Sequence, residues 1–235
     1  MAIKEMNGGV AIGSDQEVKS LTFLQKFMGI ISSPSKTFKS ICRLPDNKIP
    51  LLNAFLIIFF TSLSYYALSA HIMVNGSPSF INAFNIYLLG SFIGVILVNS
   101  LSIFIVWFVI AFAYWMVGKY FFVKRHYSDA LKIIVHCFIP LTFSRIFLLG
   151  GLYIGLTNIS IVEGQSIAAI QAELETLFNS GVWLVYDIFD TFTWLWCALI
   201  ISFALKEFYR IDLKKGLITS YSIIAVYLFL SLLAR

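Results

Sequence analysis

The sequence predicts an all-α polytopic membrane protein, a compact bundle of five transmembrane helices with amphipathic helices ahead of the first one. The composition gives the first reason: 59% of the 235 residues are hydrophobic and 12% are charged, with a mean hydropathy of +0.87. About a quarter of the residues of a soluble domain are charged. The second reason is the series of apolar runs of ~20 residues or more, the length that crosses a bilayer. The third is the placement of the cations between these runs.

The first 49 residues are predicted to be a cytoplasmic tail, and residues 50–235 the transmembrane domain. Apolar side chains recur at helical spacing over residues 18–31, and Ser33-Pro34 predicts the start of a second short helix over residues 34–43. Both segments are too polar to span, and they precede a span directly. We expect them to contact anionic lipid headgroups. The cations assigned to this contact are Lys19, Lys26, Lys36, Lys39 and Arg43.

Five spans are expected, over residues 50–74, 84–116, 130–156, 181–205 and 217–234. The second run would be roughly 50 Å long as one helix, so it tilts, extends beyond the bilayer, or breaks near Asn99-Ser100. Small residues at helical spacing allow helices to approach closely. The glycines predicted to do so are Gly90, Gly94, Gly151 and Gly155.

The cations predict the orientation of the chain. Residues 1–48 hold seven Lys and Arg, the connection over residues 75–83 holds none, and the later connections alternate between basic and free of cations. Basic connections stay on the cytoplasmic side. With five spans, we expect the N-terminus in the cytoplasm and the C-terminus outside, in the cell membrane if the chain is prokaryotic.

The fourth span carries two acids, Asp187 and Asp190, and an intramembrane carboxylate costs on the order of a few kcal/mol. They are three residues apart and share a helix face with Trp183 and Trp194. At ~1.5 Å per residue, Asp190 lies roughly 13 Å and Arg145 of the third span roughly 16 Å from the outer ends of their spans. We expect an Arg145–Asp190 pair, bidentate at best. It is either a packing clasp or part of a binding or proton-carrying site. A third possibility is that Asp187 lies close enough to the outer surface to be hydrated.

Pro140 should kink the third span and free a backbone carbonyl near His136. His136 then has an acceptor nearby. A satisfied core histidine is one interpretation, and a member of the polar cluster with Arg145, Asp187 and Asp190 is the other.

Catalytic and metal-binding patterns do not emerge from the sequence. It holds no G-x-S-x-G, H-E-x-x-H or phosphate-loop motif, and Cys42, Cys137 and Cys197 lack metal-site spacing. An intramembrane aspartyl protease needs acids on two spans, and here both are on one. We therefore predict no enzyme activity, no cofactor, no metal and no nucleic-acid partner.

Three stretches resemble the Yip (Ypt/Rab-interacting protein) family of five-span membrane proteins. They are FMGIISSPSKTFKSI before PLLNAFLII, HCFIPLTFSRIF in the third span, and LWCALIISFALKEFYRIDLKKGLI across the last two spans. The likeness covers residues from Phe23 to the C-terminus and implies five spans with a cytoplasmic N-terminus. Eukaryotic relatives bind Rab-type GTPases and carry an acidic DLYGP-type stretch before the spans. This chain lacks that stretch, so the resemblance points to a prokaryotic member and does not carry Rab binding over to this chain.

Two functions follow from these observations. The first is a non-enzymatic Yip-type protein that organises membrane or recruits protein partners, or a second copy of itself, through its N-terminal helices. The second is a small transporter or channel whose polar site comprises Arg145, Asp187, Asp190 and His136. A water-accessible cavity that reaches Asp190 favours transport, whereas a dry Arg145–Asp190 pair favours a clasp.

Overall fold

The computed structural model describes residues 21–43, 48–120, 126–178 and 181–233. Within them, five helical segments are long and apolar enough to cross a membrane. They are α3 (Lys48–Ala70), α4 (Pro78–Tyr120), the third span built from α5 (Tyr127–Val135) and α6 (Ile139–Gly155), α8 (Gly181–Tyr209) and α9 (Leu213–Leu233). The predicted all-α, five-span architecture is confirmed. The boundary at residue 49 between tail and bundle stays a prediction.

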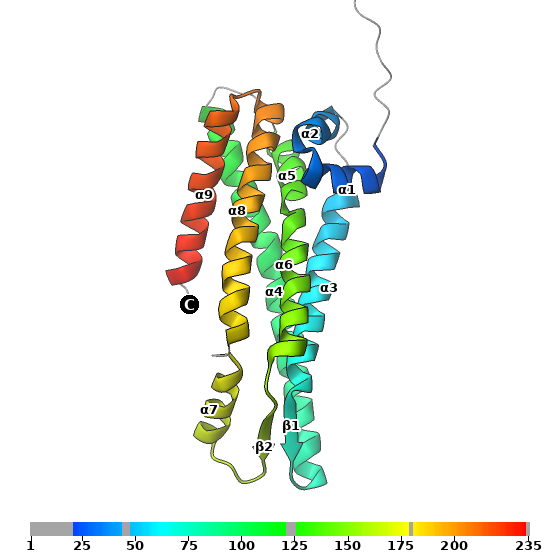
Figure 1. Ribbon diagram of the computed structural model, residues 1–235, viewed down its shortest axis with the longest axis vertical. Helices are drawn as coiled ribbons and strands as arrows, with labels where there is room; N and C mark the ends of the chain where they lie inside the picture. Colours follow the sequence, from blue (N-terminus) through cyan, green and yellow to red (C-terminus); the bar gives the residue numbers. More distant parts are fainter. Residues whose placement is uncertain (1–20, 44–47, 121–125, 179–180, 234–235) are drawn as a thin grey trace, which may run out of the picture.

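The helices form one row with a fifth helix behind it (Figure 1). α3, α6, α8 and α9 lie side by side in that order, and α4 packs against α3, α5 and α9. The short helices α1 and α2 lie at one end of the bundle, and two short strands with α7 lie at the other (Figure 1). α9 ends part-way along α8 (Figure 1).

The second apolar run forms a single unbroken helix, so the break considered near Asn99 does not occur. α4 has 43 residues, which at 1.5 Å per residue is ~65 Å, about twice the thickness of the hydrocarbon core. Asn99 and Ser100 fit inside it because the Ser100 hydroxyl donates to the carbonyl of Ile96 at 2.7 Å. A serine satisfied in this way does not interrupt a helix.

The third span is interrupted where Pro140 predicts a kink. α5 ends at Val135, one turn of 3₁₀-helix covers His136–Phe138, and α6 starts at Ile139. Proline has no N–H to donate to the preceding turn and its ring crowds the carbonyl four residues back, so the helix re-forms from Pro140 onward. The interruption separates α5, which packs against α4, from α6, which packs against α3 and α8.

The two N-terminal helices pack onto the bundle. In α1 (Phe23–Ser32), Thr22 and Gln25 form a reciprocal capping box. α2 (Pro34–Arg43) begins at the predicted proline. Ile30, Phe38 and Ile41 are fully buried in the same hydrophobic cluster as residues of the spans. α2 lies against α8.

The cations of this region differ in exposure. Lys36, Lys39 and Arg43 are exposed, as a contact with lipid headgroups requires. Lys26 is 6% exposed, so its assignment to such a contact is wrong. The apolar stripe of α1 turns outward, with Leu24 and Met28 exposed, and Lys26 lies on the side of the helix that carries the buried Ile30. Lys19 lies outside the described residues.

A small parallel sheet was not expected. β1 (Ile72–Asn75) pairs with β2 (Ile159–Val162), with Ile72 opposite Ile159 and Asn75 opposite Val162. β1 occupies the end of the predicted first span because Ile72, Met73 and Val74 continue its apolar run. The short helix α7 (Ile167–Phe178) follows β2.

The four glycines predicted to allow close helix packing divide into two pairs. Gly151 and Gly155 of α6 face Val182 of α8, and a Cβ on Gly155 would lie 2.5 Å from Val182 Cγ2. These two permit the approach of α6 to α8. Gly90 and Gly94 of α4 have no described atom within 4 Å of an added Cβ, so they join no helix pair in this chain.

Candidate functional site

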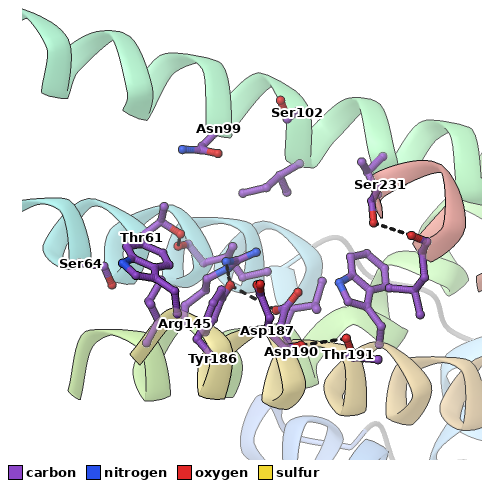
Figure 2. A pocket seen from close by; sticks show the side chains of 18 of the residues that line it. Thr61, Ser64, Asn99, Ser102, Arg145, Tyr186, Asp187, Asp190, Thr191 and Ser231 are labelled. Atoms are coloured by element: carbon purple, nitrogen blue, oxygen red, sulfur yellow. Dashed lines mark hydrogen bonds between the residues drawn. The ribbon is translucent and has the colours of Figure 1, made fainter. Parts of the chain in front are cut away.

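A cavity of about 1140 Å³ lies inside the bundle, between α3, α4, α6, α8 and α9. Ligand pockets are typically ~300–1,000 Å³. Figure 2 shows polar side chains of all five helices turned toward it. The buried core consists of two hydrophobic clusters, and both line the cavity. Leu148 and Leu152 belong to one cluster, and Trp107 and Trp194 belong to the other. The cavity therefore occupies the place where the two halves of the core meet.

The predicted polar face of α8 lines this cavity. Trp183, Asp187, Asp190 and Trp194 all belong to its wall. Their spacing of three or four residues places them along one side of the helix. Asp187 and Asp190 are both partly exposed, so the cavity reaches the two carboxyl groups.

Arg145 and Asp190 are joined through a third residue, and the expected direct pair is wrong in this detail. A guanidinium N–H of Arg145 donates to the hydroxyl of Tyr186. That hydroxyl donates to Oδ1 of Asp190 at 3.3 Å (Figure 2). Tyr186 is 6% exposed and lies one turn before Asp190 on α8, where its ring fills the space between the two charged groups. The matching depths of Arg145 and Asp190 predicted their proximity correctly.

Ser144 supplies a second link between α6 and α8. Its hydroxyl donates to the same Oδ1 of Asp190 at 2.5 Å. Ser144 is fully buried and directly precedes Arg145. Two adjacent residues of α6 are therefore linked to Asp190, Ser144 directly and Arg145 through Tyr186. Oδ1 of Asp190 thus accepts one hydrogen bond from α6 and one from its own helix α8. Arg145 Nε is buried and has no acceptor among the described residues.

The opposite wall carries polar groups that the sequence interpretation left out. They are Thr61 and Ser64 of α3, Asn99 and Ser102 of α4, and Ser231 of α9. The hydroxyls of Thr61, Ser64 and Ser102 donate to carbonyls four residues earlier at 2.7 to 2.8 Å. Their lone pairs remain available as acceptors toward the cavity. Isolated Ser and Thr are common in membrane spans, so their presence alone does not predict a site. Only their shared helix faces could have indicated that they line a cavity.

His136 lies apart from the other predicted members of the polar cluster. It is fully buried in the 3₁₀ turn before α6 and is not part of the cavity wall. Its Nδ1 lies 2.5 Å from the carbonyl of Lys132. This geometry corresponds to a buried core histidine, and the inclusion of His136 in a polar path with the two acids is wrong.

Aromatic rings make up much of the remaining wall. Trp107, Trp183 and Trp194, with Tyr65, Tyr186 and Tyr227, border the cavity. The Trp194 and Tyr227 ring centroids are 4.5 Å apart. Two carboxyl groups and one guanidinium, bordered by aromatic side chains, form an environment that suits a positively charged guest.

The comparison with known families agrees with this architecture. The family model of the Yip1 domain matches residues 28–234, which include all five spans, the second half of α1 and all of α2. The chain belongs to the Yip1 family. This confirms the resemblance drawn from the sequence motifs and supports an integral membrane protein of the Yip type. Neither a curated protein nor a solved structure matches the chain.

The family match covers every element that builds the cavity of this Yip1 protein. It also covers Met28 to Arg43, which carry the exposed cations of α2.

Proposed function

We propose that this Yip1 family member is a small transporter that binds an organic ammonium ion in its intramembrane cavity. The observation that carries the proposal is the cavity that reaches Asp187 and Asp190 within a bundle of membrane-spanning helices. A purely structural clasp would bury its carboxylates among packed side chains, because exposed charge within the bilayer is costly. Here the two acids are partly exposed beside about 1140 Å³ of open space.

The substrate class follows from the chemistry of the wall. Carboxyl groups outnumber guanidinium groups two to one, which favours a cation. The faces of Trp and Tyr attract alkylated ammonium groups within ~6 Å of the ring centroid. Small inorganic cations need several converging oxygens instead. An alkylammonium head beside Asp187 and Trp183 satisfies both features of the wall.

Ligand-induced stabilisation tests this binding. Tetramethylammonium should raise the thermal unfolding midpoint of the purified protein in nanodiscs, by the amount that mass action gives for a ligand of the folded state. Sodium at equal ionic strength is the control for salt. Asp187→Asn and Trp183→Leu should each weaken the shift, and Glu175→Gln, an exposed acid on α7, should leave it unchanged. The proposal is contradicted if sodium raises the unfolding midpoint as much as tetramethylammonium does. It is also contradicted if tetramethylammonium shifts both cavity variants as much as the wild type.

A second role is supported by a separate observation at the end of the bundle that carries α1 and α2. Leu24 and Met28 are 66% and 55% exposed on α1, and Lys36, Lys39 and Arg43 are exposed on α2. Apolar side chains beside cations are the pattern of a helix that lies in the headgroup layer. We infer that this end organises anionic lipid on the cytoplasmic side, in keeping with the predicted orientation.

Depth-dependent quenching tests the second role. An environment-sensitive fluorophore attached at Leu24→Cys or Met28→Cys, in a variant without the native cysteines, should be quenched by lipids spin-labelled near the headgroup. A label at Glu175→Cys, exposed on α7 at the other end of the bundle (Figure 1), should be quenched less. Equal quenching at all three positions would show that the face of Leu24 and Met28 does not enter the membrane.

A further inference from the structure

A second pocket lies outside the membrane-spanning core, where α2 meets the end of α8. Its volume is about 340 Å³, and Lys39, Cys42, Arg43, Glu207 and Arg210 line it. Lys39 and Arg43 are four residues apart on α2, so their side chains share one face of the helix. Arg210 approaches from the turn that follows α8, so three cations from two elements converge on one small volume.

The only acid of this pocket wall is engaged elsewhere. Oε1 of Glu207 accepts a hydrogen bond from the Ser35 hydroxyl at 2.8 Å. This bond fixes the start of α2 against α8. Within the described parts of the chain, Lys39, Arg43 and Arg210 form no ion pair with a carboxylate. Three cations against one carboxylate leave an excess of two positive charges at the pocket.

The backbone at Arg210 supports a role for its side chain. Arg210 has φ of 56°, and among the described residues no other non-glycine residue has a positive φ. It directly follows the last residue of α8, Tyr209, a position that glycine commonly takes in this left-handed conformation. A side chain with a Cβ is strained there. Strain of this kind is retained where a particular side chain is needed.

We propose that this pocket binds a phosphate monoester group, with Lys39, Arg43 and Arg210 as its ligands. Such a group carries about −1.5 to −2 charges at pH 7 and three acceptor oxygens, which match the excess charge and the three donors. The source is the headgroup of an anionic lipid such as phosphatidic acid, or a soluble phosphate. The inference goes beyond the surface contact assigned to α2, because general attraction to an anionic surface needs neither a pocket nor Arg210.

Native mass spectrometry of the full chain released from nanodiscs tests the lipid source. Phosphatidic acid should bind more tightly than phosphatidylserine or phosphatidylcholine of the same acyl chains. Arg210→Gly should lower the affinity for phosphatidic acid about tenfold, the effect of losing one hydrogen bond between charged groups. Arg210→Lys should retain most of it. A thermal shift with inorganic phosphate, with or without phosphatidic acid, measures the soluble source.

The Arg210→Gly variant also separates a binding role from a structural one. Glycine adopts a positive φ without strain, so its thermal unfolding midpoint should stay or rise while the affinity falls. Lys214→Gln removes one charge from the same basic turn outside the pocket and should leave the affinity unchanged. A shift with inorganic phosphate but no preference for phosphatidic acid supports the site with a soluble ligand. The proposal is overturned if Arg210→Gly binds phosphatidic acid and phosphate as tightly as the wild type does. It is also overturned if Lys214→Gln loses as much affinity as Arg210→Gly. The fluorescence quenching of α1 does not depend on Arg210, so the two ideas fail separately.

Discussion

The hydroxyl of Tyr186 lies 3.3 Å from Oδ1 of Asp190, one turn along the same helix. The same hydroxyl accepts a hydrogen bond from Arg145. One tyrosine therefore joins a cation of α6 to an anion of α8 at the wall of the cavity (Figure 2).

Replacing Tyr186 by Phe should destabilise the bundle by about 1–3 kcal/mol, because Arg145 loses the hydroxyl that accepts its N–H. Asp190 keeps the hydrogen bond from Ser144, so the loss should fall on Arg145. Unfolding in mixed micelles of increasing SDS content measures the change. Tyr153→Phe, on an exposed tyrosine of α6, is the matched control, and equal stability of the two variants would contradict a bridging role.

Gly155→Ala should also destabilise the protein by about 1–3 kcal/mol. The new Cβ would lie 2.5 Å from Val182 Cγ2, and valine, branched at Cβ, has little rotamer freedom to move aside. The same unfolding assay measures the effect.

Gly90→Ala is the control for this prediction. Nothing described lies within 4 Å of the added Cβ, so the helix should gain about 0.5–1 kcal/mol. Destabilisation by Gly90→Ala would mean that this face of α4 packs against a partner, contrary to the open environment found here.

The fold was predictable where the sequence carries long, uniform signals. The apolar runs predict the number of spans, and Pro140 predicts the interruption of the third. The strands were not predictable in the same way, because four residues such as Ile72 to Asn75 are too few to show a period of two. Lys26 was misassigned because helical spacing defines a stripe but not which side of it faces the bundle.

The candidate site was predictable in part for a similar reason. Charged residues within a span are rare, so Asp187, Asp190 and Arg145 stood out. Tyr186 did not, because it is one of 11 tyrosines and 17% of the chain is aromatic. The hydroxyl groups across the cavity come from α3, α4 and α9, and only the tertiary arrangement brings them to one wall. Ser144 was hidden because a single serine in a span usually bonds to its own helix.

Glu163 should make the start of α4 sensitive to pH. The backbone N–H of Ser77 donates to its carboxylate at 2.6 Å and the Ser77 hydroxyl at 2.9 Å, and these bonds lower the pKa of Glu163 below its usual 4.5. The stabilisation is therefore complete above pH 4.5 and is lost as the pH falls through the lower folded-state pKa.

Hydrogen–deuterium exchange over residues 72–80 measures this effect. After correction for intrinsic rates, wild-type protection should fall below pH 4.5, and Glu163→Gln should lower it at pH 7. The two proteins should converge at low pH, because the wild-type carboxyl is then also neutral. Equal protection of the two at pH 7 would show that the carboxylate does not hold this end.

Uptake of radiolabelled tetramethylammonium into proteoliposomes tests the transport proposal most directly. The protein should raise uptake above that of protein-free vesicles. Asp190→Asn should lower it about tenfold, as expected for the loss of one charged hydrogen-bonding partner, while Glu175→Gln should not. Uptake equal to that of protein-free vesicles, or an Asp190→Asn variant as active as the wild type, would contradict transport through this cavity.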